Sequence, residues 1–280
     1  MNNGTGAFSR KDGEAKVETR PWVRRVRQVS APVWRPLKLG AEIMRLPWIT
    51  VTVGRDAIGE RLYAFFTAPH LTYRFIPWKC LGIAIQPVPA DLAAWLDGKP
   101  KHQVRTYVRR AAAKGYTCRA FDPRAARPAI ARIYHSSAER QGAPMAFEEE
   151  AFARTAAEIP ERFIGIFAAD GTLCGLTCAE VSGDLAWMRV FICHHDHLRA
   201  GISYALIAAL IENIAQERAR SGRPCWLMYD FWFGKSAGMQ YFIRRCGFLP
   251  HNVRWRRRVF AASSDAPAAP GESPQSAPPA

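Results

Sequence analysis

The segment with the most side chains able to do chemistry is Cys193–His197, which reads Cys-His-His-Asp-His. Each of these residue types can ligate zinc. The ligands are too close together in sequence, and no second Cys/His pair follows at the spacing of a zinc finger. We therefore interpret the segment as a solvated polar loop and predict no metal site. Within it, His195 is a candidate general base.

Two carboxylates in apolar surroundings are further candidates for a general base. Glu180 ends a mostly apolar run, and its alternative interpretation is a hairpin charge paired with Arg189. Asp230 lies inside the apolar segment Cys225–Phe231, where an ionised carboxylate is costly unless it is paired. Its alternative role is that of a buried structural partner for a nearby arginine.

The elements that must position these groups are contained in Leu185–Ala215. Leu185–Ile192 is rich in aromatic and β-branched residues, as strands are. Ile202–Gln216 carries apolar residues at helical spacing, and Gly201 allows a tight turn before it. The first N–H groups of a helix lack intrahelical partners, and the helix dipole makes that end positive. The turn between this strand and this helix is therefore a candidate site for phosphate or pyrophosphate.

Two motifs resemble the GNAT acyltransferase superfamily. The turn Gly201–Leu206 is similar to the family's pyrophosphate-binding pattern, Gln/Arg-x-x-Gly-x-Gly/Ala. Gly201 matches the first glycine, whereas Leu198 stands at the Gln/Arg position and Ser203 replaces the second small residue. The segment Phe242–Phe248 resembles the family's closing helix, which ends in Gly-Phe before the last strand.

The resemblance implies that the chain is an N-acyltransferase with acetyl-CoA or another acyl-CoA as donor and an amine as acceptor. It implies that the acyl carbonyl is held by the end of the strand and the phosphates by the turn. The carbonyl contacts would come from Phe191, Ile192 and Cys193, and the phosphate contacts from Leu198, Arg199, Ala200, Gly201, Ile202 and Ser203.

The catalytic acid departs from the family pattern. The family often places a tyrosine four residues before the closing glycine, and here that position is Ile243. Tyr204, Tyr229 and Tyr241 remain as alternatives. For the base, the candidates are Glu180, Asp230 and His195.

The order of predicted elements supports the same fold. Residues 116–260 are predicted to form strand, helix, helix, three strands, helix, strand, helix and strand. This predicts a mixed α/β domain with a largely antiparallel, GNAT-like sheet and helices on both faces.

Two segments resemble the Fem-type branch of the superfamily, whose members have two GNAT-like repeats and commonly use aminoacyl-tRNA. The resemblance lies in Trp95–Lys101, which leads into a basic helix, and in the aromatic/Asp/Gly segment Tyr229–Gly234. We predict four parts. These are a disordered N-terminus (1–20), an arm with a reduced first repeat and the basic helix (21–115), the acyltransferase domain (116–262) and a disordered Pro/Ala-rich tail (263–280).

The charge of the chain points to a polyanionic partner. The net charge is +15, and no acidic residue falls between Gly98 and Phe121. We expect the helix at 99–114 to meet tRNA or an anionic membrane surface, with a solvated basic helix as the alternative. The seven cysteines lack paired spacing and no apolar leader is present, so we expect a cytoplasmic protein, with peripheral membrane association as an alternative.

Two alternatives to a CoA-dependent N-acyltransferase follow from these features. One is an aminoacyl-tRNA-dependent transferase acting on a lipid or peptidoglycan precursor. The other is a non-catalytic GNAT-like module that binds nucleic acid or a membrane surface.

Overall fold

The structure is a computed structural model that describes residues 34–70, 74, 76–140, 143–144 and 147–260. The chain divides into two units, residues 1–41 and 42–280. Of the first unit, the described residues are the beginning of helix α1 (Trp34–Met44). The predictions of disorder for 1–20 and 263–280 lie outside the described residues.

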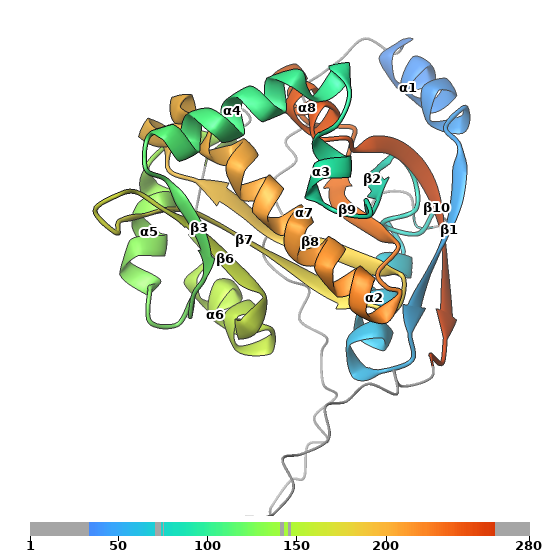
Figure 1. The fold of residues 1–280 in the computed structure, drawn as a ribbon. Helices are drawn as coiled ribbons and strands as arrows, with labels where there is room; N and C mark the ends of the chain where they lie inside the picture. The colour runs from blue at the N-terminus through green and yellow to red at the C-terminus, as the bar shows by residue number, and fades with distance from the viewer. Residues whose placement is uncertain (1–33, 71–73, 75, 141–142, 145–146, 261–280) are drawn as a thin grey trace, which may run out of the picture. The chain divides into compact units, whose positions relative to one another are not determined.

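The first half of the second unit supplies two strands and three helices (Figure 1). They are β1 (Trp48–Gly54), α2 (Ala57–Thr67), β2 (Ile83–Pro87), α3 (Leu92–Leu96), the 3-10 turn η2 (Lys99–Lys101) and α4 (His102–Ala113). Asp56 and Asp91 begin α2 and α3, and their carboxylates accept the N–H groups of Gly59 at 2.6 Å and Ala94 at 2.7 Å. These are N-caps, which satisfy backbone donors left free at a helix start.

The second half follows the predicted order of elements. It comprises β3 (Thr117–Ala120), α5 (Arg127–His135), the hairpin β4 (Glu139–Arg140) and β5 (Ala143–Pro144), α6 (Glu149–Glu158), η3 (Pro160–Arg162), β6 (Phe163–Phe167), β7 (Leu173–Ser182), β8 (Leu185–Cys193), η4 (His195–Ala200), α7 (Ile202–Ser221), β9 (Trp226–Phe231), α8 (Ala237–Arg245) and β10 (Leu249–Arg258). The β4–β5 hairpin is an addition that the apolar pattern did not predict.

Eight strands form one sheet in the order β1-β10-β2-β9-β8-β7-β6-β3. The pairs β1–β10 and β8–β9 are parallel, and the other five neighbouring pairs are antiparallel. The predicted fold class, a mixed and largely antiparallel α/β sheet, is confirmed. Strands β1 and β2 come from the region before residue 116 and pair within this same sheet, whereas the division into repeats stays a prediction.

Helices cover both faces of the sheet, as predicted. On one face, α7 packs with α3, α4 and α8 over a core that includes Ile166, Leu206 and Phe248. On the other face, α5 and α6 enclose a core around Ile133 and Phe163. Helix α2 encloses a further core around Phe66. Successive strand residues point to opposite faces, so neighbouring residues of one strand contribute to different cores.

The parallel neighbours β8 and β9 pair over only part of their lengths. Their ladder joins Leu185–Trp187 to Trp226–Met228, and β8 then continues to Cys193 while β9 continues to Phe231. Beyond the ladder, β8 remains paired with β7 on its other side, up to Cys193 with Gly175. The sheet is therefore split between the carboxyl ends of two central strands, which is the feature that positions the candidate site.

Candidate active site

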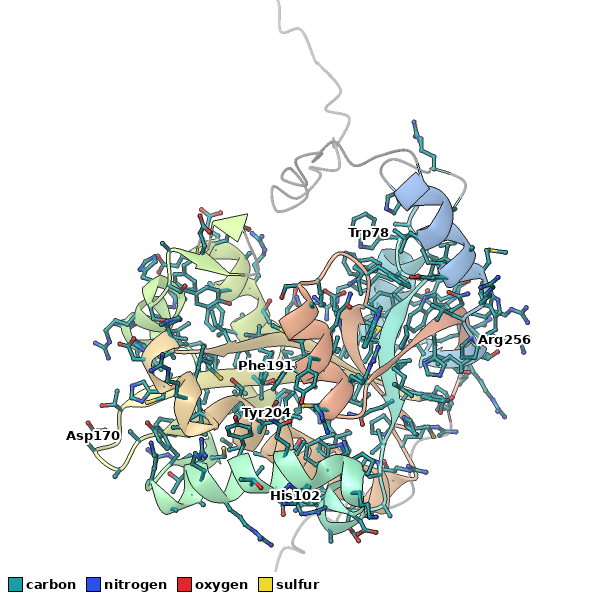
Figure 2. The ribbon with its side chains drawn as sticks, turned by 90° about the horizontal axis from the view of Figure 1, so that it is seen from above. Trp78, His102, Asp170, Phe191, Tyr204 and Arg256 are labelled. Carbon is teal, nitrogen blue, oxygen red and sulfur yellow. The ribbon has the colours of Figure 1, made fainter. Side chains whose placement is uncertain are left out.

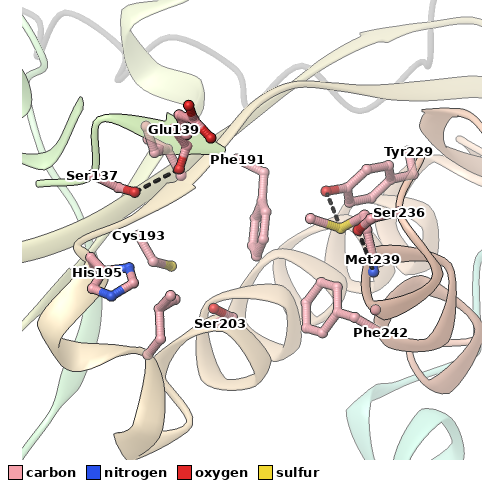
Figure 3. A pocket seen from close by; sticks show the side chains of 13 residues that line it. Ser137, Glu139, Phe191, Cys193, His195, Ser203, Tyr229, Ser236, Met239 and Phe242 are labelled. Carbon is pink, nitrogen blue, oxygen red and sulfur yellow. Dashed lines mark hydrogen bonds between the residues drawn. The ribbon is translucent and has the colours of Figure 1, made fainter. Parts of the chain in front are cut away.

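A cavity of about 520 Å³ lies at the split between β8 and β9 (Figure 3). Strand β8 supplies Phe191, Ile192 and Cys193, and strand β9 supplies Tyr229. The remaining lining residues are Ser137 and Glu139 after α5, His195 and Leu198 in η4, Ser203 in α7, Ser236 before α8, and Gly238, Met239 and Phe242 within it. Six segments of the chain therefore meet at this cavity.

Aromatic rings form the wall that lies towards α8. The ring of Phe191 stacks on Phe242 with centroids 5.9 Å apart and meets the edge of Tyr229 at 6.1 Å. Phe242 in turn contacts Tyr204 of α7 at 4.9 Å. These contacts hold β8, β9, α7 and α8 in one arrangement, and they give the cavity an apolar side opposite the polar residues of η4.

Tyr229 places a hydroxyl group in the cavity. It is 8% exposed, and its hydroxyl donates to the Met239 sulfur at 3.6 Å. Burial raises the pKa of Tyr229, and neighbouring Cys246, Asp230 and Cys193 act in the same direction. The phenol is therefore protonated at neutral pH. Because a thioether is a weak acceptor, this proton is available to a stronger acceptor in the cavity.

The amino end of α7 reaches the cavity through Ser203. Gly201 is in the left-handed region with φ 89°, and its carbonyl accepts the N–H groups of Tyr204 and Ala205 at 3.0 and 3.2 Å. The helix dipole favours negative charge at this end. The other side of the turn is covered by α4, since a Cβ on Gly201 would be 2.7 Å from the Tyr107 carbonyl oxygen.

The residues expected to bind the donor divide into two groups. Phe191, Ile192, Cys193, Leu198 and Ser203 line the cavity. The other four are placed elsewhere. Ala200, Gly201 and Ile202 are buried, and Arg199 is exposed on η4.

Of the three candidate bases, His195 lines the cavity. Its backbone N–H donates to the Ser136 hydroxyl at 3.0 Å, which holds the beginning of η4 against the end of α5. The imidazole lies on the polar side of the cavity, across from Tyr229 in Figure 3.

Glu180 lies in an ion-pair network on the α6 side of the sheet. It is 1% exposed and pairs with Arg61 and with Arg189, the latter at 3.0 Å. Arg189 also contacts Glu158 at 2.8 Å and the Thr155 hydroxyl at 3.0 Å. The pairing with Arg189, which was the alternative interpretation of Glu180, is present.

Asp230 pairs with a lysine. Its carboxylate contacts Lys79, which is 2% exposed and whose ammonium lies 4.5 Å from the ring centroid of Phe231. Asp230 is therefore the charge partner of a buried cation. The sequence indicated an arginine for this role because it gave no sign that Lys79 would be buried.

The basic helix α4 lies beside the candidate donor turn, with Tyr107 stacked on Tyr204 at 4.9 Å (Figure 2). Its basic residues have different surroundings. Arg105 donates to the carbonyls of Leu96 and Gly98, the latter at 2.9 Å, and Lys101 lies 4.3 Å from the Trp95 ring. Arg109 and Arg110 are exposed. The cavity lining includes none of these four residues.

Several lining residues were not among the site residues predicted from the sequence. Ser137 and Glu139 follow α5, Ser236 caps α8 by accepting the Met239 N–H at 3.3 Å, and Met239 and Phe242 lie on α8. A Ser before an apolar helical run signals a cap, which identifies Ser236 as a helix start and gives no sign of a cavity. Tyr229 was one of three tyrosines considered, and it is the one that lines the cavity.

No family model matches the sequence, and no curated protein matches it. The solved structures similar to it include acyltransferases of the GNAT superfamily, which the sequence motifs resemble. FemX matches at TM-score 0.48 and 9% identity over 61% of this chain and 59% of its own. L-PGS from Bacillus licheniformis matches at TM-score 0.43 and 12% identity over 61% of this chain and 60% of its own.

A third structure is the ribosomal-protein-S18-alanine N-acetyltransferase from Escherichia coli, at TM-score 0.30 and 21% identity over 37% of this chain and 61% of its own. The chain thus spans less than two thirds of the length of each of these proteins. The similarities concern the fold.

Proposed function

We propose that the β8–β9 cavity transfers an acyl group from an activated donor to an amine. The observation that carries the proposal is the meeting, in one cavity, of three features that this reaction needs. They are the split end of β8, the amino end of α7 at Ser203, and the protonated hydroxyl of Tyr229.

The chemistry assigns a role to each feature. Backbone groups of β8 beyond the ladder face the split, and N–H groups there would polarise the acyl carbonyl. The amine nitrogen attacks the carbonyl carbon and loses a proton to His195, directly or through water. The bond from that carbon to the leaving sulfur or oxygen breaks, and Tyr229 supplies the proton that the leaving atom takes up. Holding donor and amine together supplies much of the rate enhancement.

Acyl-CoA is the first donor to test, since Ser203 brings the positive end of α7 to the cavity. Aminoacyl-tRNA is the second candidate, and a different observation favours it. Helix α4 packs on the Gly201 turn and exposes Arg109 and Arg110, with no carboxylate on the helix. Such a surface suits a long polyanion better than a single diphosphate.

We propose that the reaction takes place in the cytoplasm, because all seven cysteines are free and disulfides are rare in that reducing compartment. No helix among the described residues has the length and apolar character needed to cross a membrane.

The test measures the thermal unfolding midpoint of the full chain with acetyl-CoA, longer-chain acyl-CoA, CoA and bulk aminoacylated tRNA. A ligand of the folded state raises the midpoint once its concentration exceeds its Kd. The cavity-filling variant is Ser203→Trp. Its matched control is Asn213→Trp, which places the same ring on the exposed side of α7.

We expect one donor class to raise the midpoint, and Ser203→Trp to abolish the shift while Asn213→Trp retains it. Donor turnover, followed as release of free thiol or deacylated tRNA with a mixture of amines, then separates catalysis from binding. If no donor shifts the midpoint and none is consumed, the transferase proposal is wrong, and a non-catalytic binding module remains.

A further inference from the structure

Three arginines form a row on one face of β10. Arg254, Arg256 and Arg258 are alternate residues of the strand and are exposed, whereas Val253 and Trp255, which precede the first two of them, are buried. Alternate residues of a strand share a face and are spaced about 7 Å apart. Figure 2 shows Arg256 at the outer margin of the molecule, away from Phe191 of the candidate active site.

The neighbouring strand offers no charge to balance this row. The residues of β1 in register with the three arginines are Thr50, Thr52 and Gly54. Within the described part of the chain, no carboxylate forms an ion pair with Arg254, Arg256 or Arg258. Repulsion along the row is therefore uncompensated in the free protein.

Arg257, the remaining arginine of this run, has a different environment. It points to the opposite face of the strand, pairs with Glu60 at 2.7 Å and lies over the ring of Tyr63 at 4.4 Å. The contrast shows that β10 can pair an arginine where a carboxylate is provided. The other three arginines form an outward-facing cationic row that has no carboxylate partner among the described residues.

Apolar side chains lie beside the row. Trp48 starts β1 in register with Asn252, is 45% exposed, and has the Arg254 guanidinium 5.0 Å from its ring centroid. Met44, four residues earlier, is 72% exposed and follows Ile43, whose carbonyl accepts the side-chain N–H of Asn252 in β10 at 2.9 Å. Tryptophan favours the boundary between lipid headgroups and hydrocarbon, where an exposed methionine also gains by burial.

We propose that this face, defined as Met44, Trp48, Arg254, Arg256 and Arg258, docks on an anionic membrane surface. Lipid phosphates neutralise the charges of the three arginines, and the two apolar side chains enter the interfacial region of the membrane. A nucleic acid would use Trp48 as a stacking platform, yet one face of that ring is taken by Arg254, and Met44 would gain nothing. The face is separate from α4 and from the cavity.

The test is co-sedimentation of the full chain with vesicles of phosphatidylcholine alone or with one third phosphatidylglycerol. The variant is R254E/R256E/R258E, and its matched control is R109E/R110E/K114E on α4. Each triple reversal lowers the net charge from +15 by 6, to +9. A milder variant, R254Q/R256Q/R258Q, and the single substitution Trp48→Ser are included in case the charge reversal unfolds the protein. The thermal unfolding midpoint of each variant shows whether it is folded.

We expect binding to the anionic vesicles only. The glutamine triple should lose about a hundredfold in partition, at about fivefold for each arginine, and the glutamate triple should lose more because it adds repulsion. The α4 control should bind nearly as well as the natural chain, and Trp48→Ser should bind several-fold more weakly. Equal losses in both charge-reversal variants would show a general effect of net charge and overturn the proposal. So would unchanged binding by the glutamine variant. Because the vesicles contain no acyl donor, these outcomes are independent of the transferase activity.

Discussion

The Tyr107 carbonyl oxygen lies where a side chain at residue 201 would have to be. A Cβ added to Gly201 would be 2.7 Å from that oxygen and 3.0 Å from Tyr107 Cβ. Glycine at this position therefore allows α4 to pack against the amino end of α7, in addition to allowing the turn. In this chain, the glycine of the candidate phosphate-binding motif is also a helix-packing residue.

Gly201→Ala should therefore destabilise the fold through two effects. The left-handed backbone, with φ 89°, disfavours a residue with a Cβ by about 1–2 kcal/mol. The contact with the Tyr107 backbone adds about 1–3 kcal/mol, as overpacking does elsewhere. The matched control is Gly222→Ala, where φ is 72° and nothing lies within 4 Å. Urea unfolding should give a larger loss for residue 201, and equal losses would show that α4 does not constrain it.

Tyr229→Phe should lower kcat for acyl transfer by about 100-fold or more, since general acids contribute about 10²–10⁴-fold. Stability and KM should change little, because the hydroxyl contacts only the weak acceptor Met239 among the described residues. The pH profile adds a second readout. Because burial raises the pKa of Tyr229 above the ordinary 10.0, any alkaline loss of activity from this group should occur above that pH.

The control variants for this prediction are Tyr204→Phe and Tyr241→Phe. Tyr204 stacks on Tyr107, and burial raises its pKa to about 12. Tyr241 is 48% exposed and donates to the Gln103 side chain at 2.9 Å. Both should keep near-normal kcat. A Tyr229→Phe enzyme as active as the natural chain would remove the acid role.

The fold was largely predictable because its signals are local. Apolar Val253 and Trp255 alternate with Arg254 and Arg256, which predicts a strand, and apolar residues at helical spacing predict α7. The pairing of β1 with β10 was not predictable, since the two strands are some 200 residues apart in the chain and nothing in either sequence specifies a partner. Pairing depends on which apolar faces share a core, and this is decided by tertiary packing.

The site was less predictable than the fold. The motif at residues 198–203 lies at the end of α7 that borders the cavity, and of its residues only Leu198 and Ser203 line that cavity. Glu180 and Asp230 looked functional because carboxylates in apolar strands need a partner. Glu180 pairs with Arg189, nine residues away and already considered as its partner from the sequence, and also with Arg61, which is more than 100 residues away. Asp230 pairs with Lys79, again more than 100 residues away. A sequence can therefore suggest a local partner for a buried charge, whereas the distant partners depend on the fold.

Glu180→Ala should cost about 3 kcal/mol of stability, because it leaves two guanidinium groups without the carboxylate that they share. It should leave kcat unchanged, since Glu180 lies outside the cavity lining. Urea unfolding checks the first expectation and a transfer assay the second. Glu217→Ala, which removes the partner of Arg162, is the control and should cost less because the Glu217 side chain is 21% exposed, against 1% for Glu180. A Glu180 variant that is stable and inactive would restore this carboxylate as a candidate base.

A related prediction concerns the pH dependence of stability in this network. Burial raises the pKa of Glu158, but the hydrogen bonds and charges of Arg189 and Arg61 outweigh it, so the pKa lies below the ordinary 4.5. A lowered carboxylate pKa stabilises the fold above the unfolded value and loses that contribution as pH falls through the folded value. Below pH 4.5, the free energy of unfolding should therefore fall less steeply in Glu158→Gln than in the natural chain. Parallel curves would contradict the pairing.

Lys101 is partly buried, and its ammonium nitrogen is buried near the carboxyl end of α8 with no hydrogen-bond partner in the described residues. The nitrogen lies 4.3 Å from the Trp95 ring centroid, and a Cβ on Gly247 would be 2.9 Å from it. Burial lowers the pKa of Lys101 to about 8, and the nearby Cys246 thiol acts in the opposite direction. The fold therefore holds a cation that it solvates poorly.

The consequence is a stability that rises with pH. Between pH 8 and 10.5, the folded state has released the Lys101 proton while the unfolded chain still binds it, so the free energy of unfolding increases with pH in that window. Below pH 8 both states are protonated, and the cost of the buried charge is constant. Lys101→Met keeps the apolar stem and removes the charge. It should be more stable than the natural chain at pH 7 and should lose this rise. Lys99→Met, on the exposed side of the same turn, is the control and should retain it. Urea unfolding at pH 7, 8, 9 and 10 measures both. A natural chain whose stability is flat over this range would show that the Lys101 amine is solvated in the folded protein.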